Sequence, residues 1–125
     1  MFKENADIKK YIGENLKEYL SKSGDSLIDF RDSLQYTKFL GAENSSNELY
    51  GWIQYSINDK VFYIITAYSE QNDKKIFHTK EWEEIKKIAK RKKCEYIRMS
   101  TKRSPKHFEK IYKLRPVQTI MELEL

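Results

Sequence analysis

Few residues of this sequence combine a reactive side chain with a neighbour that would tune it. Glu70 directly follows the apolar run YIITAYS and is a candidate general base, with an exposed loop carboxylate as the alternative. His78 and His107 are each capable of acid or base chemistry, but each lies singly among polar neighbours, which favours surface histidines. Cys94 is expected in the core at a helix–strand junction, so we interpret it as a packing residue.

Metal and disulfide chemistry have no support in this pattern. The single cysteine cannot form an intramolecular disulfide, and no set of Cys and His has the spacing of a metal site. The N-terminal residues carry charges early and lack the apolar region of a signal peptide. No stretch approaches the roughly 20 apolar residues that a membrane span needs. We therefore expect a protein that is not secreted and has no metal and no membrane partner.

Charge is divided unevenly along the chain. Residues 1–70 carry 8 Lys and Arg against 11 Asp and Glu, a net −3, whereas residues 71–125 carry 16 against 8, a net +8. A basic C-terminal half is compatible with a nucleic-acid partner, for which Lys102, Arg103 and Lys106 are the candidate contacts. The alternative is a solvated Lys-rich surface, which we favour because glutamates interrupt the basic residues.

The elements that position these side chains fit one domain of 125 residues. Apolar residues at helical spacing predict a helix over residues 5–22, ended by Gly24. A second helix is predicted to start at Asp25 or Ser26. Its expected buried face consists of Leu27, Phe30 and Leu34.

Three strands are predicted next, the first a short one that ends at Gly41. The β-rich runs 49–57 and 60–68 flank Asn58 and Asp59, and a tight turn there makes them an antiparallel hairpin. Aromatic residues alternate along this hairpin, and we expect them to fill a core or a protein interface rather than to stack on bases. They are Tyr50, Trp52, Tyr55, Phe62, Tyr63 and Tyr68.

The second half contains the clearest helical pattern, over residues 79–93, with glutamates in the first turn and basic residues in the last. A strand over 94–100, a short helix over 104–112 and a terminal strand over 117–125 follow. The predicted order is ααβββαβαβ, a mixed α/β architecture. The buried face of the long helix is expected to contain Trp82, Ile85, Ile88 and Ala89.

Two stretches, TKEWEEIKKIAKRKKCEYIRMSTKR and FEKIYKLRPVQTIMELEL, carry a family resemblance. They are similar to the third helix, fifth strand, fourth helix and last strands of the GNAT superfamily of N-acetyltransferases. The likeness is closer still to short GNAT-like proteins encoded by tailed bacteriophages. The resemblance implies one α/β domain with a mixed, mostly antiparallel central sheet flanked by helices.

The resemblance also implies where acetyl-CoA would bind, and the residues there depart from the family pattern. GNAT enzymes hold the pyrophosphate on a loop of the form Q/R-x-x-G-x-G/A that opens the third helix. The matching residues, 74–84, contain no glycine, and three glutamates in the first helical turn would repel a diphosphate. We expect no cofactor, or acetyl-CoA if the protein is an enzyme. The candidate cofactor-binding residues are then Phe77, His78, Thr79 and Lys80.

The catalytic acid of the family is also in doubt. Many GNAT enzymes use a tyrosine in the fourth helix to protonate the departing thiolate, and the resemblance places Phe108 there. Tyr112, one helical turn further on, is the substitute candidate. The candidate catalytic residues are therefore Glu70 and Tyr112, and Tyr112 could take the place of the acid only with a shifted backbone.

These observations favour a non-catalytic GNAT-like protein of phage or mobile-element origin that acts by binding another protein. Its role would be a virion component, an assembly factor or a binder of a host target. The alternative is an active N-acetyltransferase with an atypical phosphate loop, and a third hypothesis is a nucleic-acid-binding accessory protein. The expected location is the bacterial cytoplasm or the virion.

Overall fold

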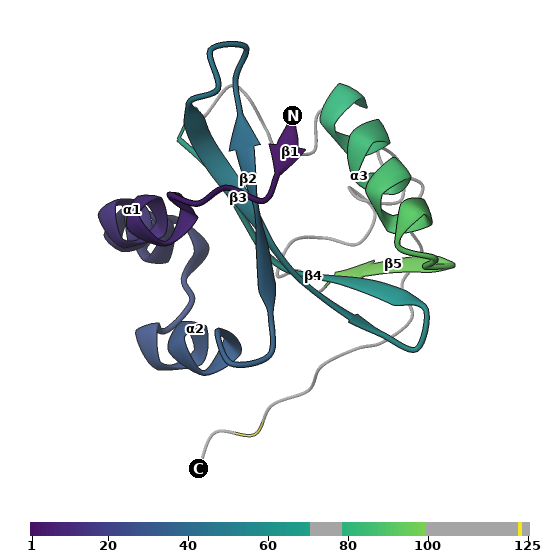
Figure 1. The fold of residues 1–125 in the computed structure, drawn as a ribbon. Helices are drawn as coiled ribbons and strands as arrows, with labels where there is room; N and C mark the ends of the chain where they lie inside the picture. Colours follow the sequence, from purple (N-terminus) through teal and green to yellow (C-terminus); the bar gives the residue numbers. More distant parts are fainter. Residues whose placement is uncertain (71–78, 100–122, 124–125) are drawn as a thin grey trace.

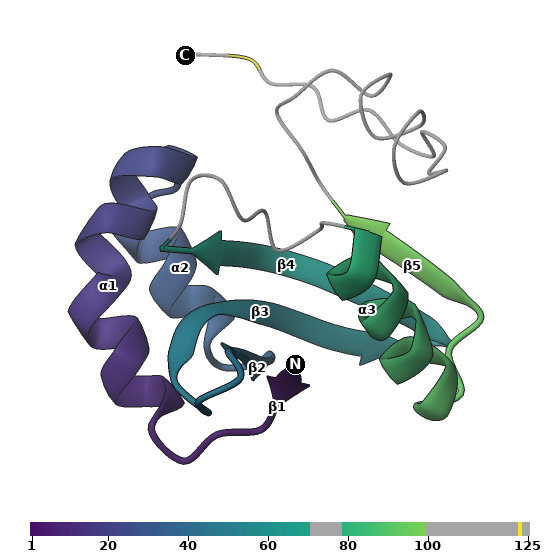
Figure 2. The same ribbon diagram turned by 90° about the horizontal axis from the view of Figure 1, so that it is seen from above.

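The structure of the protein, a computed structural model, describes residues 1–70, 79–99 and 123. The described strands form one sheet in the order β1-β2-β3-β4-β5. Helices α1 and α2 cover one face of this sheet and α3 covers the other (Figures 1 and 2). The helices are α1 (Ile8–Ser23), α2 (Leu27–Ser33) and α3 (Thr79–Arg91). The strands are β1 (Phe2–Lys3), β2 (Lys38–Glu43), β3 (Leu49–Asn58), β4 (Val61–Ser69) and β5 (Tyr96–Met99).

The end of α1 and the start of α2 are each fixed by a capping residue. Gly24 ends α1 in the left-handed conformation, with φ of 74°, and its N–H donates to the Leu20 carbonyl. This confirms the predicted helix stop, because glycine has no Cβ to oppose a positive φ. Ser26 caps α2 by accepting a hydrogen bond of 3.0 Å from the Asp29 N–H.

The predicted buried face of α2 is wrong in two of its three residues. Phe30 is buried, but Leu27 and Leu34 are exposed, at 37% and 45%. The polar Ser33 is buried in their place. A helix of seven residues has too few turns for apolar spacing to fix its orientation, and the hydrogen bond that Ser33 accepts from Gln54 holds the Ser33 side toward the sheet.

Strands β3 and β4 form the predicted antiparallel hairpin, with the turn one residue later than expected. Asn58 pairs with Val61, so Asp59 and Lys60 are the two turn residues. Their φ angles are 50° and 64°, and a two-residue type I′ turn requires positive values at both positions. Aspartate adopts this conformation more readily than most residues, which allows the shift.

The N-terminal strand β1 was not predicted from the sequence. It pairs antiparallel with β2 through Phe2–Ala42 and Lys3–Gly41, and the helix expected from residue 5 begins only at Ile8. Strand β2 consequently continues past its expected end at Gly41 as far as Glu43. Strand β5 lies parallel to β4, from the Val61–Tyr96 pair to the Ile64–Met99 pair.

Two apolar cores lie on opposite faces of the sheet. The α3 face buries Trp82, Ile85, Ile88 and Ala89, as the helical spacing predicted. Sheet residues packed with them include Ile53, Tyr55, Phe62 and Ile64. The core beneath α1 and α2 contains Tyr11, Ile12, Tyr19, Phe30, Trp52 and Tyr68. The hairpin aromatics thus mostly fill cores, which confirms that prediction.

The described elements confirm an α/β fold with a mostly antiparallel sheet flanked by helices. The predicted helix over 104–112 and strand over 117–125 lie outside the described residues. No helix within residues 1–70 or 79–99 is long and apolar enough to span a membrane.

Candidate functional site

A buried polar network joins helix α2 to the middle of the sheet. The Gln54 side chain, fully buried, donates to the hydroxyls of Ser33 and Thr37 over 2.7 and 2.8 Å. Its oxygen accepts from the Thr66 hydroxyl over 2.8 Å, and that hydroxyl accepts from the Trp52 indole over 3.2 Å. A satisfied buried network of this kind is rigid, so it fixes α2 on the sheet.

A β-bulge at Ile65 makes this network possible. Gln54 pairs with Thr66 while Tyr55 pairs with Ile64, which leaves Ile65 as an extra residue in β4. One extra residue reverses the alternation of side chains along a strand. Ile64 therefore packs in the α3 core, whereas Thr66 bonds to Gln54 on the α2 face.

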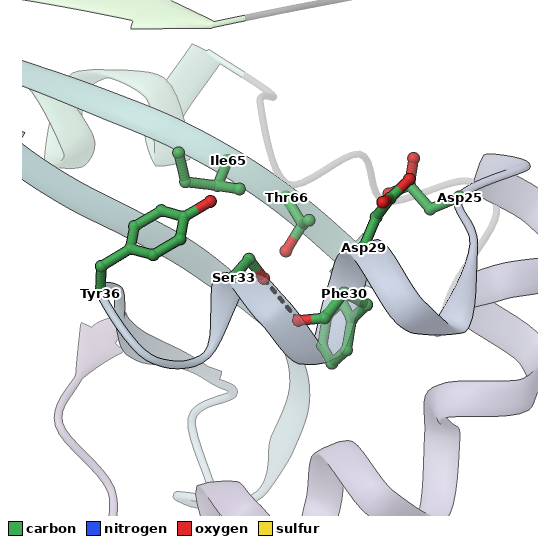
Figure 3. A pocket seen from close by; sticks show the side chains of 7 residues that line it. All are labelled: Asp25, Asp29, Phe30, Ser33, Tyr36, Ile65 and Thr66. Carbon is green, nitrogen blue, oxygen red and sulfur yellow. Dashed lines mark hydrogen bonds between the residues drawn. The ribbon is translucent and has the colours of Figure 1, made fainter.

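Beside the bulge, a cavity of about 220 Å³ lies between α2 and β4 (Figure 3). Ile65 and Thr66 form its β4 side and the remaining residues belong to α2 and its two ends. In Figure 3 two aspartates lie at one end of the cavity and a tyrosine ring at the other. We call this cavity the α2–β4 pocket. Its described lining is Asp25, Asp29, Phe30, Ser33, Tyr36, Ile65 and Thr66.

The carboxylates of the pocket are held differently. Asp25 accepts a hydrogen bond from the buried Tyr19 hydroxyl, which ties it to α1. Burial, and then the hydrogen bond to Asp25, raise the pKa of Tyr19 well above its usual value, so the phenol stays protonated. Asp29 is exposed in the first turn of α2. The pocket therefore presents one fixed and one solvent-accessible carboxylate.

A second group of tyrosines and carboxylates lies where α1 crosses the end of β4. The Tyr68 hydroxyl donates to Glu18 over 2.6 Å, and Glu18 also forms an ion pair of 2.9 Å with Lys22. Burial and the bond to Glu18 raise the pKa of Tyr68, and the same bond lowers the pKa of Glu18. Tyr68 is therefore a neutral donor, not a ready source of phenolate.

Glu70, the predicted general base, lies beside this group. Its backbone N–H donates to the Tyr50 carbonyl over 2.9 Å, and the residue is exposed. The buried Tyr11 hydroxyl has no partner of normal hydrogen-bond geometry among the described residues. Its pKa is nevertheless raised, first by burial and then by the nearby Glu70 carboxylate. Glu70 thus faces α1, and its role as a base stays a prediction.

The three glutamates at the start of α3, which form one negative patch in the sequence, have different partners in the structure. Glu84 accepts a hydrogen bond of 2.6 Å from the Phe2 N–H of β1. Glu83 forms an ion pair of 2.7 Å with Lys86, which lowers the Glu83 pKa. Glu81 lies near Tyr50. Burial raises the pKa of Tyr50, and the negative charges of Glu81 and Glu84 raise it further. The structure therefore assigns Glu84 to the anchoring of β1.

Several predicted site residues lie outside the part of the chain that the structure describes. Of the candidate cofactor contacts, Lys80 is exposed on α3 and Thr79 begins that helix. Cys94 is partly buried against the α3 core, in line with its predicted packing role. Within residues 1–70 and 79–99 no His, Cys, Asp or Glu group could hold a metal ion. The undescribed candidates are Phe77, His78, Lys102, Arg103, Lys106, His107 and Tyr112, together with Phe108 at the position of the family's acid.

Sequence reasoning missed the α2–β4 pocket altogether. The sequence pattern indicates Asp25 only as a possible helix start, and it distinguishes neither Asp29 nor Tyr36. One signal was present, because three aspartates fall within eight residues of a short helix (25–32). Nothing in the sequence marks the bulge that brings β4 to them.

No protein-family model matches the chain, and no curated protein does. Solved structures do match. A putative acetyltransferase (YycN) from Bacillus subtilis is 12% identical, with a TM-score of 0.69 over 100% of this chain and 98% of that one. A Trypanosoma brucei acetyltransferase is 17% identical, with a TM-score of 0.59 and coverage of 100% and 97%. The aminoglycoside N-acetyltransferase AAC(6')-Iy, solved in complex with CoA, is 12% identical, with a TM-score of 0.55 and coverage of 93% and 94%.

Proposed function

Because this chain has the fold of the GNAT superfamily, we propose that it uses this scaffold to bind another protein. In this proposal it does not hold acetyl-CoA in the usual way. The resemblance of residues 79–125 to phage-encoded proteins extends the proposal to a virion component, an assembly factor or a binder of a host target.

The surface around the α2–β4 pocket carries this proposal. Tyr36 and Ile65 line the pocket yet are 67% and 37% exposed, and Ile28 on the same helix is 70% exposed. Tyr36 and Ile65 thus place exposed apolar surface beside a recess, a combination that makes this face a candidate interaction site. This surface belongs to a rigid part of the molecule, since the Gln54 network fixes α2.

The start of α3 does not fit the pyrophosphate of acetyl-CoA. Backbone N–H groups approach phosphate closely where glycines open the helix, and no glycine occurs after Gly51. Glu81 and Glu84 lie near enough to Tyr50 to raise its pKa, and the N-terminal ammonium of Met1, 3.9 Å from Glu84, offsets part of this negative charge. Lys80 is the single cation of the first helical turn and offsets part of that charge.

A second candidate function is an N-acetyltransferase with an atypical phosphate loop. The structural similarity to AAC(6')-Iy, solved with CoA, favours it, as do the two pocket aspartates, which suit a cationic amine acceptor. Incubation with acetyl-CoA and a panel of primary amines separates the two functions. We expect thiol release no faster than uncatalysed hydrolysis. Amine-dependent thiol release that saturates with acetyl-CoA would establish the second function instead.

A further inference from the structure

We propose that the α2–β4 pocket receives a lysine or arginine side chain presented by the protein partner. This inference rests on the proposed binding function and names the chemistry of the partner. It is carried by the charge of the pocket, by the use of its hydroxyl groups, and by its size and walls.

The charge around the pocket is negative. Asp25 and Asp29 line it, and none of its described lining residues carries a positive charge. Between residues 25 and 36, three aspartates face one arginine, a net of −2. A positive side chain is therefore the complementary occupant, and such complementarity also guides encounter.

The hydroxyl donors of the pocket floor are already used. Ser33 donates to the Phe30 carbonyl over 2.6 Å and accepts from Gln54. Thr66 donates to Gln54 and accepts from Trp52. Neither of these two hydroxyls has a proton left for an anion, so Tyr36 supplies the one hydroxyl donor of the described lining, whereas the two carboxylates offer several acceptor sites to a cation.

The size of the pocket suits one long side chain. Its volume of about 220 Å³ lies below the roughly 300–1,000 Å³ of sites that bury whole small-molecule ligands. Phe30 and the bulged Ile65 supply apolar walls for an aliphatic stem. The Tyr36 side chain lies opposite the aspartates in Figure 3, and an aromatic ring at this place allows a cation–π contact with a guanidinium or ammonium group.

The test uses short acetylated and amidated peptides with one central arginine flanked by leucines. Control peptides carry citrulline, which keeps the shape and removes the charge. Binding is followed by amide chemical shifts of the full-length, isotope-labelled protein. We expect the arginine peptide to shift Asp29, Ile65 and Thr66 in a saturable way, and the citrulline peptide to leave them unchanged.

Two variants sharpen the result. D29N removes a pocket carboxylate without touching the Tyr19–Asp25 bond, and we expect it to weaken arginine-peptide binding about fivefold, the upper end for an accessible ion pair. D32N is the matched control, because Asp32 belongs to the same helix but does not line the pocket. Equal binding of both peptides, or equal loss in both variants, would overturn the inference.

A third arm addresses the nature of the occupant. Spermidine that saturates the same amides at lower concentration than the peptide would assign the pocket to a small polyamine and overturn the protein partner. This outcome is independent of the acetyl-CoA assay. Measured acetyl transfer would contradict the proposed function. Equal binding of the arginine and citrulline peptides would contradict only the inference about this pocket.

Discussion

The Thr66 hydroxyl donates to the Gln54 side chain over 2.8 Å, and the two residues are paired across strands β3 and β4. They share a face of the sheet only because Ile65 is an extra residue in β4. Ile64, two residues before Thr66, packs on the opposite face with α3. Because of the bulge, β4 contributes side chains to the cores on both faces of the sheet. The extra residue, Ile65, lies at the α2–β4 pocket.

Replacement of Gln54 by leucine is expected to lower the free energy of unfolding by about 1–3 kcal/mol, because buried hydroxyls lose their partners. Urea denaturation measures the change. Gln35→Leu is the matched control, since Gln35 is exposed at the end of α2, and its effect should stay within about 0.5 kcal/mol. Equal effects of the two variants would show that the network contributes no stability.

Comparison of an Ile65 deletion with Ile65→Ala distinguishes the effect of the bulged backbone from the effect of the Ile65 side chain. Without the extra residue, Thr66 and Tyr68 would turn toward the α3 face, so we expect the deletion to abolish cooperative unfolding. Ile65→Ala keeps the backbone, and because the side chain is 37% exposed, it should cost at most about 1 kcal/mol. Thermal melts followed by circular dichroism measure both. A deletion variant as stable as the alanine variant would contradict the role of the bulge.

Stability is expected to fall as pH rises above about 10, the ordinary pKa of tyrosine. The pKa values of Tyr11, Tyr19 and Tyr68 are raised in the folded state, first by burial. The folded state therefore binds more protons than the unfolded state above pH 10, and stability that is complete below that pH is lost as pH rises. The slope approaches about 1.4 kcal/mol per pH unit for each such tyrosine.

Urea midpoints across this range, together with tyrosinate absorbance, measure the effect. Of the nine tyrosines, those three should ionise only on unfolding. Tyr68→Phe should reduce the slope, because it removes one of the three tyrosines whose pKa is raised in the folded state. Ionisation of all nine in the native protein near pH 10 would contradict the assignment.

Much of the fold could be predicted because its longer elements have strong apolar periods. Trp82, Ile85 and Ile88 are spaced for one face of a helix of 13 residues, and all three are buried. Strand β1 could not be found, because two residues carry no period and its pairing with Ala42 and Gly41 is long-range. The hairpin was correct in its strands and wrong by one residue in its turn.

The pocket could not be predicted, because it depends on tertiary events that no local pattern records. The spacing of Leu27 and Leu34 is that of core residues, but the hydrogen bond from Gln54 to Ser33 turns another side of α2 toward the sheet. The bulge at Ile65 has no glycine or other local marker. Asp25 and Asp29 therefore form part of a pocket only because α2 packs against β4 in the folded protein.

Trp82→Ala should lower the free energy of unfolding by roughly 3–5 kcal/mol, since the side chain is 6% exposed in the α3 core. A loss of this size would unfold a domain of marginal stability. Chemical denaturation gives the value, with Lys90→Ala on the exposed side of the same helix as the control. An unchanged unfolding midpoint would instead place Trp82 on a binding surface.

Calorimetric titration of the protein with acetyl-CoA tests the central claim most directly. The glycine-free segment before α3 and the carboxylates of its first turns predict no saturable heat at sub-millimolar ligand. Glu81→Gln is the informative variant, because loss of a like charge near a helix N-terminus should favour any residual binding by about 0.3–1 kcal/mol. A dissociation constant near about 10 μM for the unaltered protein, roughly −7 kcal/mol, would contradict the account and establish a cofactor site.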